Sequence, residues 1–320
     1  MLKGRSTNMR RIFKTIEDHL TECTTLEKGV WVHLQSPTKE EVDGLTTRFN
    51  LDPTFLPAAL DEEESARIDY DSDKQQTLII VDIPYVDTEG TGYVYSTIPL
   101  GIVLCDEVII TVCTRDTPII NDFTEERIRN FWTFKRTRFI LQILQRNAGR
   151  FLSYLKQIDK TSQHIQEKLE HTSRNQELLH MMKLEKSPVY FNTSLKGNAL
   201  VMERLMRQDI LKRYPEDTDL LEDVIIENKQ AMEMCSIYRD IMSNTTDAFA
   251  SIINNNLNIT MKVLTALTVL FAVPTLVMTI WGINVPVPFE RQAWGFAAVC
   301  GISIILTLFA FVIMRRKNMF

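Results

Sequence analysis

The stretch "MKVLTALTVLFAVPTLVMTIWGIN", residues 261–284, includes 19 consecutive uncharged residues at positions 263–281. A second uncharged run of 22 residues follows at 293–314. With a rise of about 1.5 Å per residue, helices of these lengths reach roughly 28 and 33 Å and cross a hydrocarbon core of about 30 Å. We therefore predict a C-terminal two-helix transmembrane hairpin, with helices over 259–281 and 293–314 and an outer loop over 282–292.

Charges beside the two spans predict their orientation. Lys262 flanks the first span and the basic tail 315–320 follows the second, whereas Glu290 and Arg291 leave the loop neutral. Basic residues favour the cytoplasmic side of a membrane. We expect a multi-pass protein of the plasma membrane with both termini in the cytoplasm.

The first 258 residues are acidic, with 31 basic and 40 acidic side chains. This net charge of −9 would repel nucleic-acid phosphates and suits cations or basic partners, so we expect no nucleic-acid partner. The five cysteines form no CxxC pair, which indicates a reducing compartment. The first 20 residues lack a continuous apolar stretch, and we interpret them as a short amphipathic helix or an arm rather than a secretory signal.

Residues 1–124 predict a cytoplasmic α/β domain. A helix is expected over 36–50, with Pro37 in its first turn. Segments rich in β-branched and aromatic residues predict strands at 29–34, 66–71, 76–86, 91–105 and 107–114.

Residues 125–214 predict long cytoplasmic helices: one or two up to residue 186, then a break and a further helix over 187–214. From Pro215 a stalk helix over 215–258 should continue into the first span, because no helix breaker interrupts it. A heptad seam along this helix predicts packing against neighbouring helices. The seam consists of Ala231, Cys235, Tyr238, Met242, Thr245, Phe249 and Ile252.

Small and hydroxyl residues form a stripe along the first span. Steps of three and four from Asn258 reach Met261, Thr265, Thr268, Ala272, Thr275 and Thr279. Two interpretations stay open: tight packing between membrane helices, or a water-filled pore lined by hydroxyls. A pore requires several subunits around an axis, in which case Asn284 recurs as a ring of carbonyl oxygens at the outer mouth. Gly282 lets the backbone leave the helix there, and Pro286 and Pro288 prevent its continuation.

The run "NITMKVLTALTVLFAVPTLVMTIWGIN" (258–284), with its typical "MKVLT" and the hairpin around it, resembles the CorA family of divalent-cation channels. The resemblance extends with less specificity over the cytoplasmic part. It implies a homopentameric funnel around a central pore, embedded in membrane lipid. It also implies that the loop motif binds hydrated Mg²⁺ and that cytoplasmic Mg²⁺ between adjacent subunits holds the channel closed.

Carried over by position, the resemblance assigns roles to individual residues. The expected selectivity loop contains Gly282, Ile283, Asn284 and Glu290. The expected pore lining contains Asn258, Met261, Leu264, Thr265, Thr268, Ala272, Thr275 and Thr279, with Met261 and Leu264 at the inner hydrophobic constriction. The expected regulatory metal sites between subunits contain Asp87, Asp223 and Asp247.

The sequence departs from the family at two places: the loop reads Gly-Ile-Asn in place of Gly-Met-Asn, and Ala272 stands where Met is common. A path of Thr and Asn oxygens without Cys or His suits Mg²⁺ better than Zn²⁺. We predict a Mg²⁺ channel for influx of the hydrated ion, with Mg²⁺ as both cargo and regulator. The open alternatives are a transporter of Zn²⁺, Co²⁺ or Ni²⁺ and a membrane-anchored metal sensor that does not conduct. No enzyme motif is found.

Overall fold

The computed structural model describes residues 9–87, 94–105, 108–172, 175–207, 211, 214–283 and 294–317. The chain forms two compact units, Met1–Thr246 (unit 1) and Asp247–Phe320 (unit 2). The described strands are β1 (Met9–Ile16), β2 (His19–Cys23), β3 (Val30–Gln35), β4 (Arg67–Asp71), β5 (Gln76–Asp87), β6 (Val94–Leu104) and β7 (Val108–Cys113). The described helices are α1 (Lys39–Arg48), α2 (Phe55–Ala58), α3 (Pro118–Thr124), α4 (Arg136–Thr172), α5 (Asn175–Arg207), α6 (Pro215–Trp281) and α7 (Gly295–Arg316).

Unit 1 is built on one sheet in which the described strands follow the order β2-β1-β3-β7-β6-β5-β4. β3 and β7 pair in parallel, and the other neighbouring pairs are antiparallel. The five strands predicted from the sequence correspond to β3 through β7, so the prediction of an α/β domain is confirmed.

The interpretation of the N-terminus as a helix or an arm is wrong, because β1 and β2 form a hairpin at the sheet edge. Its two-residue turn is Glu17-Asp18, and both residues have positive φ, at 48° and 65°. Turns of this kind usually carry Asn-Gly or Asp-Gly, so the sequence lacks the usual signal. The Arg11 guanidinium pairs with Glu22 across the hairpin at 3.0 Å.

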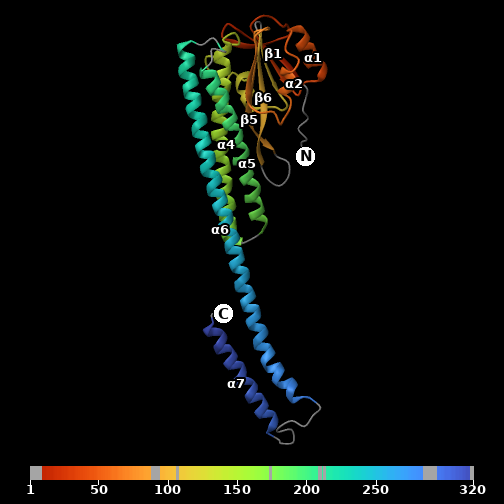
Figure 1. Ribbon diagram of the computed structural model, residues 1–320, viewed down its shortest axis with the longest axis vertical. Coiled ribbons are helices and arrows are strands. Elements are labelled where there is room, and N and C mark those ends of the chain that lie inside the picture. The colour runs from red at the N-terminus through yellow and green to blue at the C-terminus, as the bar shows by residue number, and fades with distance from the viewer. Residues whose placement is uncertain are drawn as a thin grey trace. The chain divides into compact units, whose positions relative to one another are not determined.

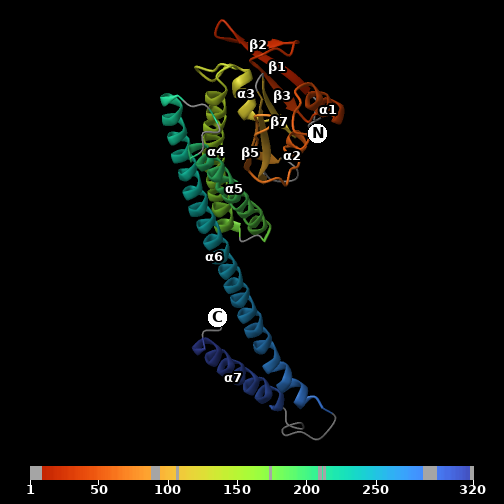
Figure 2. The ribbon, with the colours of Figure 1, turned by 45° about the horizontal axis from the view of Figure 1, so that its top comes forward.

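Each face of the sheet is covered by helices and carries its own hydrophobic core (Figures 1 and 2). On one face α1 and α2 pack on β3, β6 and β7, and Ala59 lies so close to Gly101 that no side chain fits at Gly101. On the other face, buried residues of α3, α4, α5 and α6 surround the fully buried Trp31 and its aromatic neighbours. This second core joins the long helices to the sheet.

The predicted break after residue 186 is wrong, since α5 continues through Pro188. Neighbouring elements hold this segment in place. The Ser187 hydroxyl accepts the backbone N–H of Tyr95 at 3.2 Å, and the carbonyl of Pro188 accepts the Cys235 thiol from α6. Tertiary contacts thus stabilise a helix that its sequence alone would interrupt.

The first turn of α6 is fixed by acidic residues, as the sequence predicts. Asp217 accepts the backbone N–H of Tyr214 at 3.2 Å, and Glu216 pairs with Arg138 of α4 at 3.2 Å. Within unit 1 the heptad positions Ala231, Cys235 and Met242 are buried. The stalk therefore packs through the predicted seam.

Unit 2 consists, among its described residues, of the C-terminal part of α6 and of α7. Both helices are long and apolar enough to cross a membrane. The Trp281 and Phe296 rings lie 6.5 Å apart between centroids, so the two helices meet near the end of α6. On α7 the buried side chains Val299, Ser303 and Met314 share one face. A hairpin of two apolar helices is therefore present.

Candidate ion pathway

The predicted pore-lining residues share one exposed face of α6. An α-helix turns by about 100° per residue, which places all eight positions within about 120° of its circumference. Every one of them is exposed: Asn258, Met261, Leu264, Thr265, Thr268, Ala272, Thr275 and Thr279. The structure thus brings together the whole predicted stripe.

The threonine hydroxyls of this face donate their hydrogen bonds within the helix. Each donates to the carbonyl four residues earlier, at 2.7 to 2.8 Å, in the pairs Thr265–Met261, Thr268–Leu264, Thr275–Phe271 and Thr279–Thr275. A hydroxyl has one proton and two acceptor lone pairs. Because the proton is used inside the helix, the oxygen offers only acceptor capacity to the outside. Such a surface accepts hydrogen bonds from the waters around a cation.

The side of α6 opposite the threonines carries the fully buried Ala266 and also Trp281, whose ring contacts Phe296 of α7. Ala266 and Trp281 lie about 140° and 160° from the middle of the threonine face. Within one chain, therefore, the threonines do not serve to pack α6 against α7. This geometry leaves the threonine face open to water or to another subunit, and both interpretations of the stripe stay open.

The outer end of the stripe is described up to Ile283. The backbone N–H of Gly282 donates to the carbonyl of Met278 at 2.9 Å, and a β-carbon at Gly282 would lie 3.3 Å from the same oxygen. Ile283 is about half exposed. The predicted loop residues Asn284 and Glu290 lie outside the described residues, so the collar stays a prediction.

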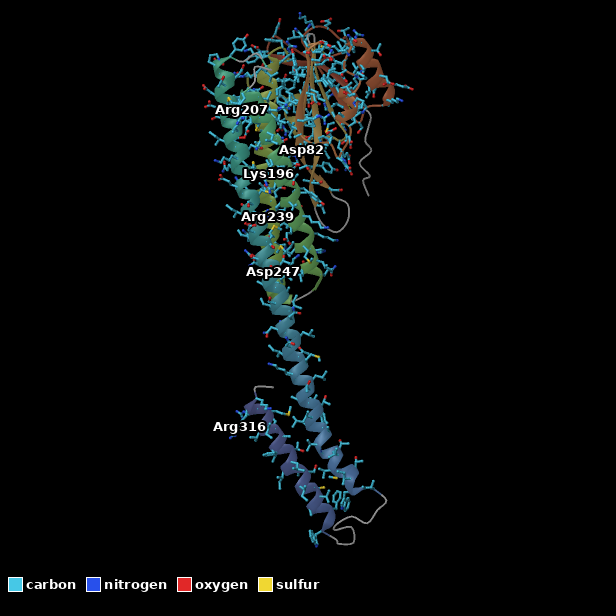
Figure 3. All side chains as sticks on the ribbon, in the orientation of Figure 1. Asp82, Lys196, Arg207, Arg239, Asp247 and Arg316 are labelled. Atoms are coloured by element: carbon cyan, nitrogen blue, oxygen red, sulfur yellow. The ribbon has the colours of Figure 1, made fainter. Side chains whose placement is uncertain are left out.

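The three predicted regulatory aspartates lie far apart in the sequence. Asp87 ends β5, Asp223 is exposed on the stalk part of α6, and Asp247 is exposed where unit 2 begins (Figure 3). Among the described residues, no group of three or more His, Cys, Asp or Glu side chains could hold a metal ion.

Sequence reasoning missed one carboxylate beside Asp223. Burial raises the pKa of Glu227, the Asp223 carboxylate raises it further, and Arg146 lowers it. The two acids are four residues apart on α6 and therefore on the same side of the helix. That spacing was the available signal. Bringing a cation to Asp223 would also relieve repulsion at Glu227.

A second missed carboxylate is Asp82, one of the two charged residues of β5; the other is its last residue, Asp87. Burial raises its pKa to about 6, and a hydrogen bond from Ser194 opposes the shift. Its backbone carbonyl accepts from the side-chain amides of Asn147 and Asn198, each at 2.8 Å. This polar group joins β5 to α4 and α5.

Comparison with known proteins identifies the family. The family described as CorA-like Mg²⁺ transporter protein matches residues 27–316, which include α6, α7 and all the predicted sites. The chain belongs to the CorA-like Mg²⁺ transporter family. It is 25% identical over 299 residues to the cobalt/magnesium transport protein CorA of Methanocaldococcus jannaschii, covering 90% of each chain. It is 22% identical over 328 residues to the magnesium transport protein CorA of Wolinella succinogenes, covering 97% of this chain and 96% of that one.

The CorA-like fold extends over the whole chain. The complete structure of the CorA magnesium transporter from M. jannaschii superimposes with a TM-score of 0.82 at 21% identity, covering 98% of this chain and 99% of that one. The fold class predicted from the sequence is thereby confirmed: an α/β domain, long helices and C-terminal apolar helices. The hairpin of β1 and β2 precedes the residues that the CorA-like family matches.

Proposed function

We propose that this CorA-like protein forms a homopentamer whose central pore carries hydrated Mg²⁺ into the cytoplasm. The observation that supports this best is the exposed threonine face of α6, with its protons bound internally and its oxygen lone pairs directed outward. Five such faces around an axis would enclose a path of neutral oxygens. The selectivity loop would stand at its outer end, with Asn284 as the ring of carbonyl oxygens.

Neutral acceptors suit a hydrated divalent ion. Mg²⁺ prefers oxygen and dehydrates reluctantly, so it would pass with its inner waters in place. These waters donate hydrogen bonds, and Thr268, Thr275 and Thr279 accept them. A carboxylate in the path would hold a divalent ion too strongly for rapid exit. Moving two charges through an inside-negative potential of 100 mV yields about 4.6 kcal/mol, which drives influx.

The inner constriction in this proposal is apolar. Met261 and Leu264 are 55% and 58% exposed on the same face as the threonines. Rings of these side chains would exclude water when the helices approach each other, and a pore without water does not conduct ions. Closing would therefore need only a small movement of α6 toward the axis.

Regulation is proposed to act through Asp87 and Asp223 of unit 1 and through Asp247, the first residue of unit 2. At resting Mg²⁺ concentrations, ions between subunits would neutralise Asp87, Asp223 and Asp247 and stabilise the closed state. When the ions leave, repulsion between like charges would favour the open state. Within one chain, the Asp223 carboxylate raises the pKa of Glu227, as repulsion between like charges does.

Co²⁺ is a second candidate cargo, because the M. jannaschii relative is a cobalt/magnesium transport protein. Zn²⁺ and Ni²⁺ transport and a non-conducting sensor are the remaining alternatives. Competition between metals separates the cargoes. A sensor would instead show assembly that depends on metal and no flux of any of these ions.

The deciding experiment measures Mg²⁺ influx into liposomes that contain the purified full-length protein and an internal Mg²⁺ dye. We expect flux from the wild type and little from Asn284→Ala. The matched control is Asn256→Ala, because Asn256 is an exposed amide on α6 about 140° from the middle of the threonine face. Equal flux from both variants would exclude the collar, and silence of the folded wild type with all four metals would exclude transport.

A further inference from the structure

Four cations gather at one end of the two-helix hairpin of unit 2. Lys262 precedes Trp281 by 19 residues, and Arg316 follows Phe296 by 20 residues. The Trp281 and Phe296 rings are in contact, and within unit 2 the two helices run antiparallel (Figures 1 and 2). At about 1.5 Å per residue, Lys262 and Arg316 both lie about 30 Å from the aromatic contact. The two helices therefore place cations at the same level.

These cations have no carboxylate near them in unit 2. Its described residues include one acid, Asp247, which precedes Lys262 by 15 residues, or about 22 Å of helix. The four cations Lys262, Arg315, Arg316 and Lys317 are exposed (Arg316 is labelled in Figure 3). An exposed apolar surface of α7 leads directly to them and includes Ile302, Ile305, Leu308, Phe309 and Val312.

The helix dipole explains only part of this arrangement. Arg315 and Arg316 lie in the last turn of α7, where cations interact favourably with the free carbonyls. Lys262 lies in the interior of α6, far from either end of that helix. It also lies about 100° from the middle of the threonine face, so it does not face the proposed ion path. Its exposed ammonium group is therefore available to an anion outside unit 2.

We propose that Lys262, Arg315, Arg316 and Lys317 form a binding surface for the headgroups of anionic phospholipids on the cytoplasmic side of the membrane. Clusters of basic residues directly beside a membrane span attract anionic lipids, at about 1 kcal/mol per residue. A guanidinium binds phosphate oxygens in a bidentate manner, and the long stems extend along the acyl chains toward the headgroup. This inference concerns the lipid around the protein and holds whichever ion is carried.

The test is thermal unfolding of the full-length protein in a neutral detergent, with added phosphatidylglycerol or phosphatidylcholine at equal concentration. We expect phosphatidylglycerol to raise the Tm of the wild type by about 2–4 °C more than phosphatidylcholine does. The triple variant Arg315→Gln/Arg316→Gln/Lys317→Gln should lose this difference. The matched control Arg10→Gln/Lys28→Gln/Lys39→Gln removes three exposed cations of unit 1 and should keep it.

A second variant tests the proposal in case the triple variant does not insert correctly into the membrane. Lys262→Gln leaves the basic end of α7 intact, and it should reduce the response to phosphatidylglycerol without removing it. An unchanged response in both variants would overturn the proposal, as would an equal effect of the two lipids on the wild type. Soluble glycerol 1-phosphate should have no effect; if it reproduced the stabilisation, the site would bind a free phosphate ester and the membrane-surface proposal would be wrong.

Discussion

The side-chain amide of Asn198 bonds to both the backbone N–H and the backbone carbonyl of Asp82. The N–H of Asp82 donates to Asn198 Oδ1 at 2.9 Å, and Asn198 Nδ2 donates to the carbonyl of Asp82 at 2.8 Å. The pairing of β4 with β5 reaches only Ile80, so Asp82 lies on an edge that none of the described strands covers. Asn198 takes the place of the missing strand and joins α5 to the sheet.

Replacing Asn198 with Ala should therefore destabilise unit 1. The change leaves the N–H of Asp82 without this acceptor in a part-buried site, at a cost of about 1–3 kcal/mol. Unfolding of the purified protein in urea, followed by tryptophan fluorescence, measures the change. Lys196→Ala is the control, because Lys196 is exposed on the same helix (Figure 3). Equal stability of the two variants would show that the amide does not hold the edge.

Asp82 should make stability depend on pH. Its folded pKa is raised to about 6 from an ordinary 3.8, so the folded state binds more protons than the unfolded state between these values. Stability from this group is present at pH 4 and is lost as the pH rises toward and above 6. Asp82→Asn should raise the Tm most at pH 7 and least near pH 4.5. Asp43→Asn, an exposed acid on α1, should show no such trend; a constant Tm difference for Asp82→Asn would contradict the shift.

The threonine face can be tested by removing single oxygens. Thr268→Val and Thr275→Val keep the shape of the side chain and delete an acceptor worth about 1 kcal/mol, so we expect Mg²⁺ flux to fall at least about fivefold. Thr307→Val is matched to both, because Thr307 on α7 donates to Ser303 O at 2.8 Å in the same way. Liposome flux should be unchanged in Thr307→Val. An equal fall in all three variants would place the ion path elsewhere.

Asp223 should control inhibition by cytoplasmic Mg²⁺. Asp223→Ala removes one proposed Mg²⁺ ligand, so less Mg²⁺ binds between subunits at a given concentration and closure should require a higher Mg²⁺ concentration. The measurement is flux into liposomes as a function of Mg²⁺ on the face that carries unit 1. Asp73→Ala, an exposed acid distant in sequence, serves as the control. Closure of Asp223→Ala at the wild-type concentration would remove this residue from gating.

Local patterns determined much of this protein from the sequence alone. Two uncharged runs predict the hairpin because backbone groups in a membrane must bond within a helix, and steps of three and four place the stripe on one face. The strands β3 through β7 were predictable from β-branched residues and the turns between them. The family resemblance rested on 258–284 and is confirmed by the match over 27–316.

Tertiary structure decided the rest, since those features depend on neighbours distant in sequence. The hairpin of β1 and β2 closes on Glu17-Asp18 because pairing with β3 outweighs a poor turn sequence. α5 continues through Pro188 because β6 and α6 bond to its flanking groups. Only the fold shows that Asn198 completes the edge at Asp82 and that Trp281, which contacts Phe296 of α7, lies on the side of α6 opposite its threonines. In each case long-range contacts compete with local conformational preference, and only the local preference can be read from the sequence.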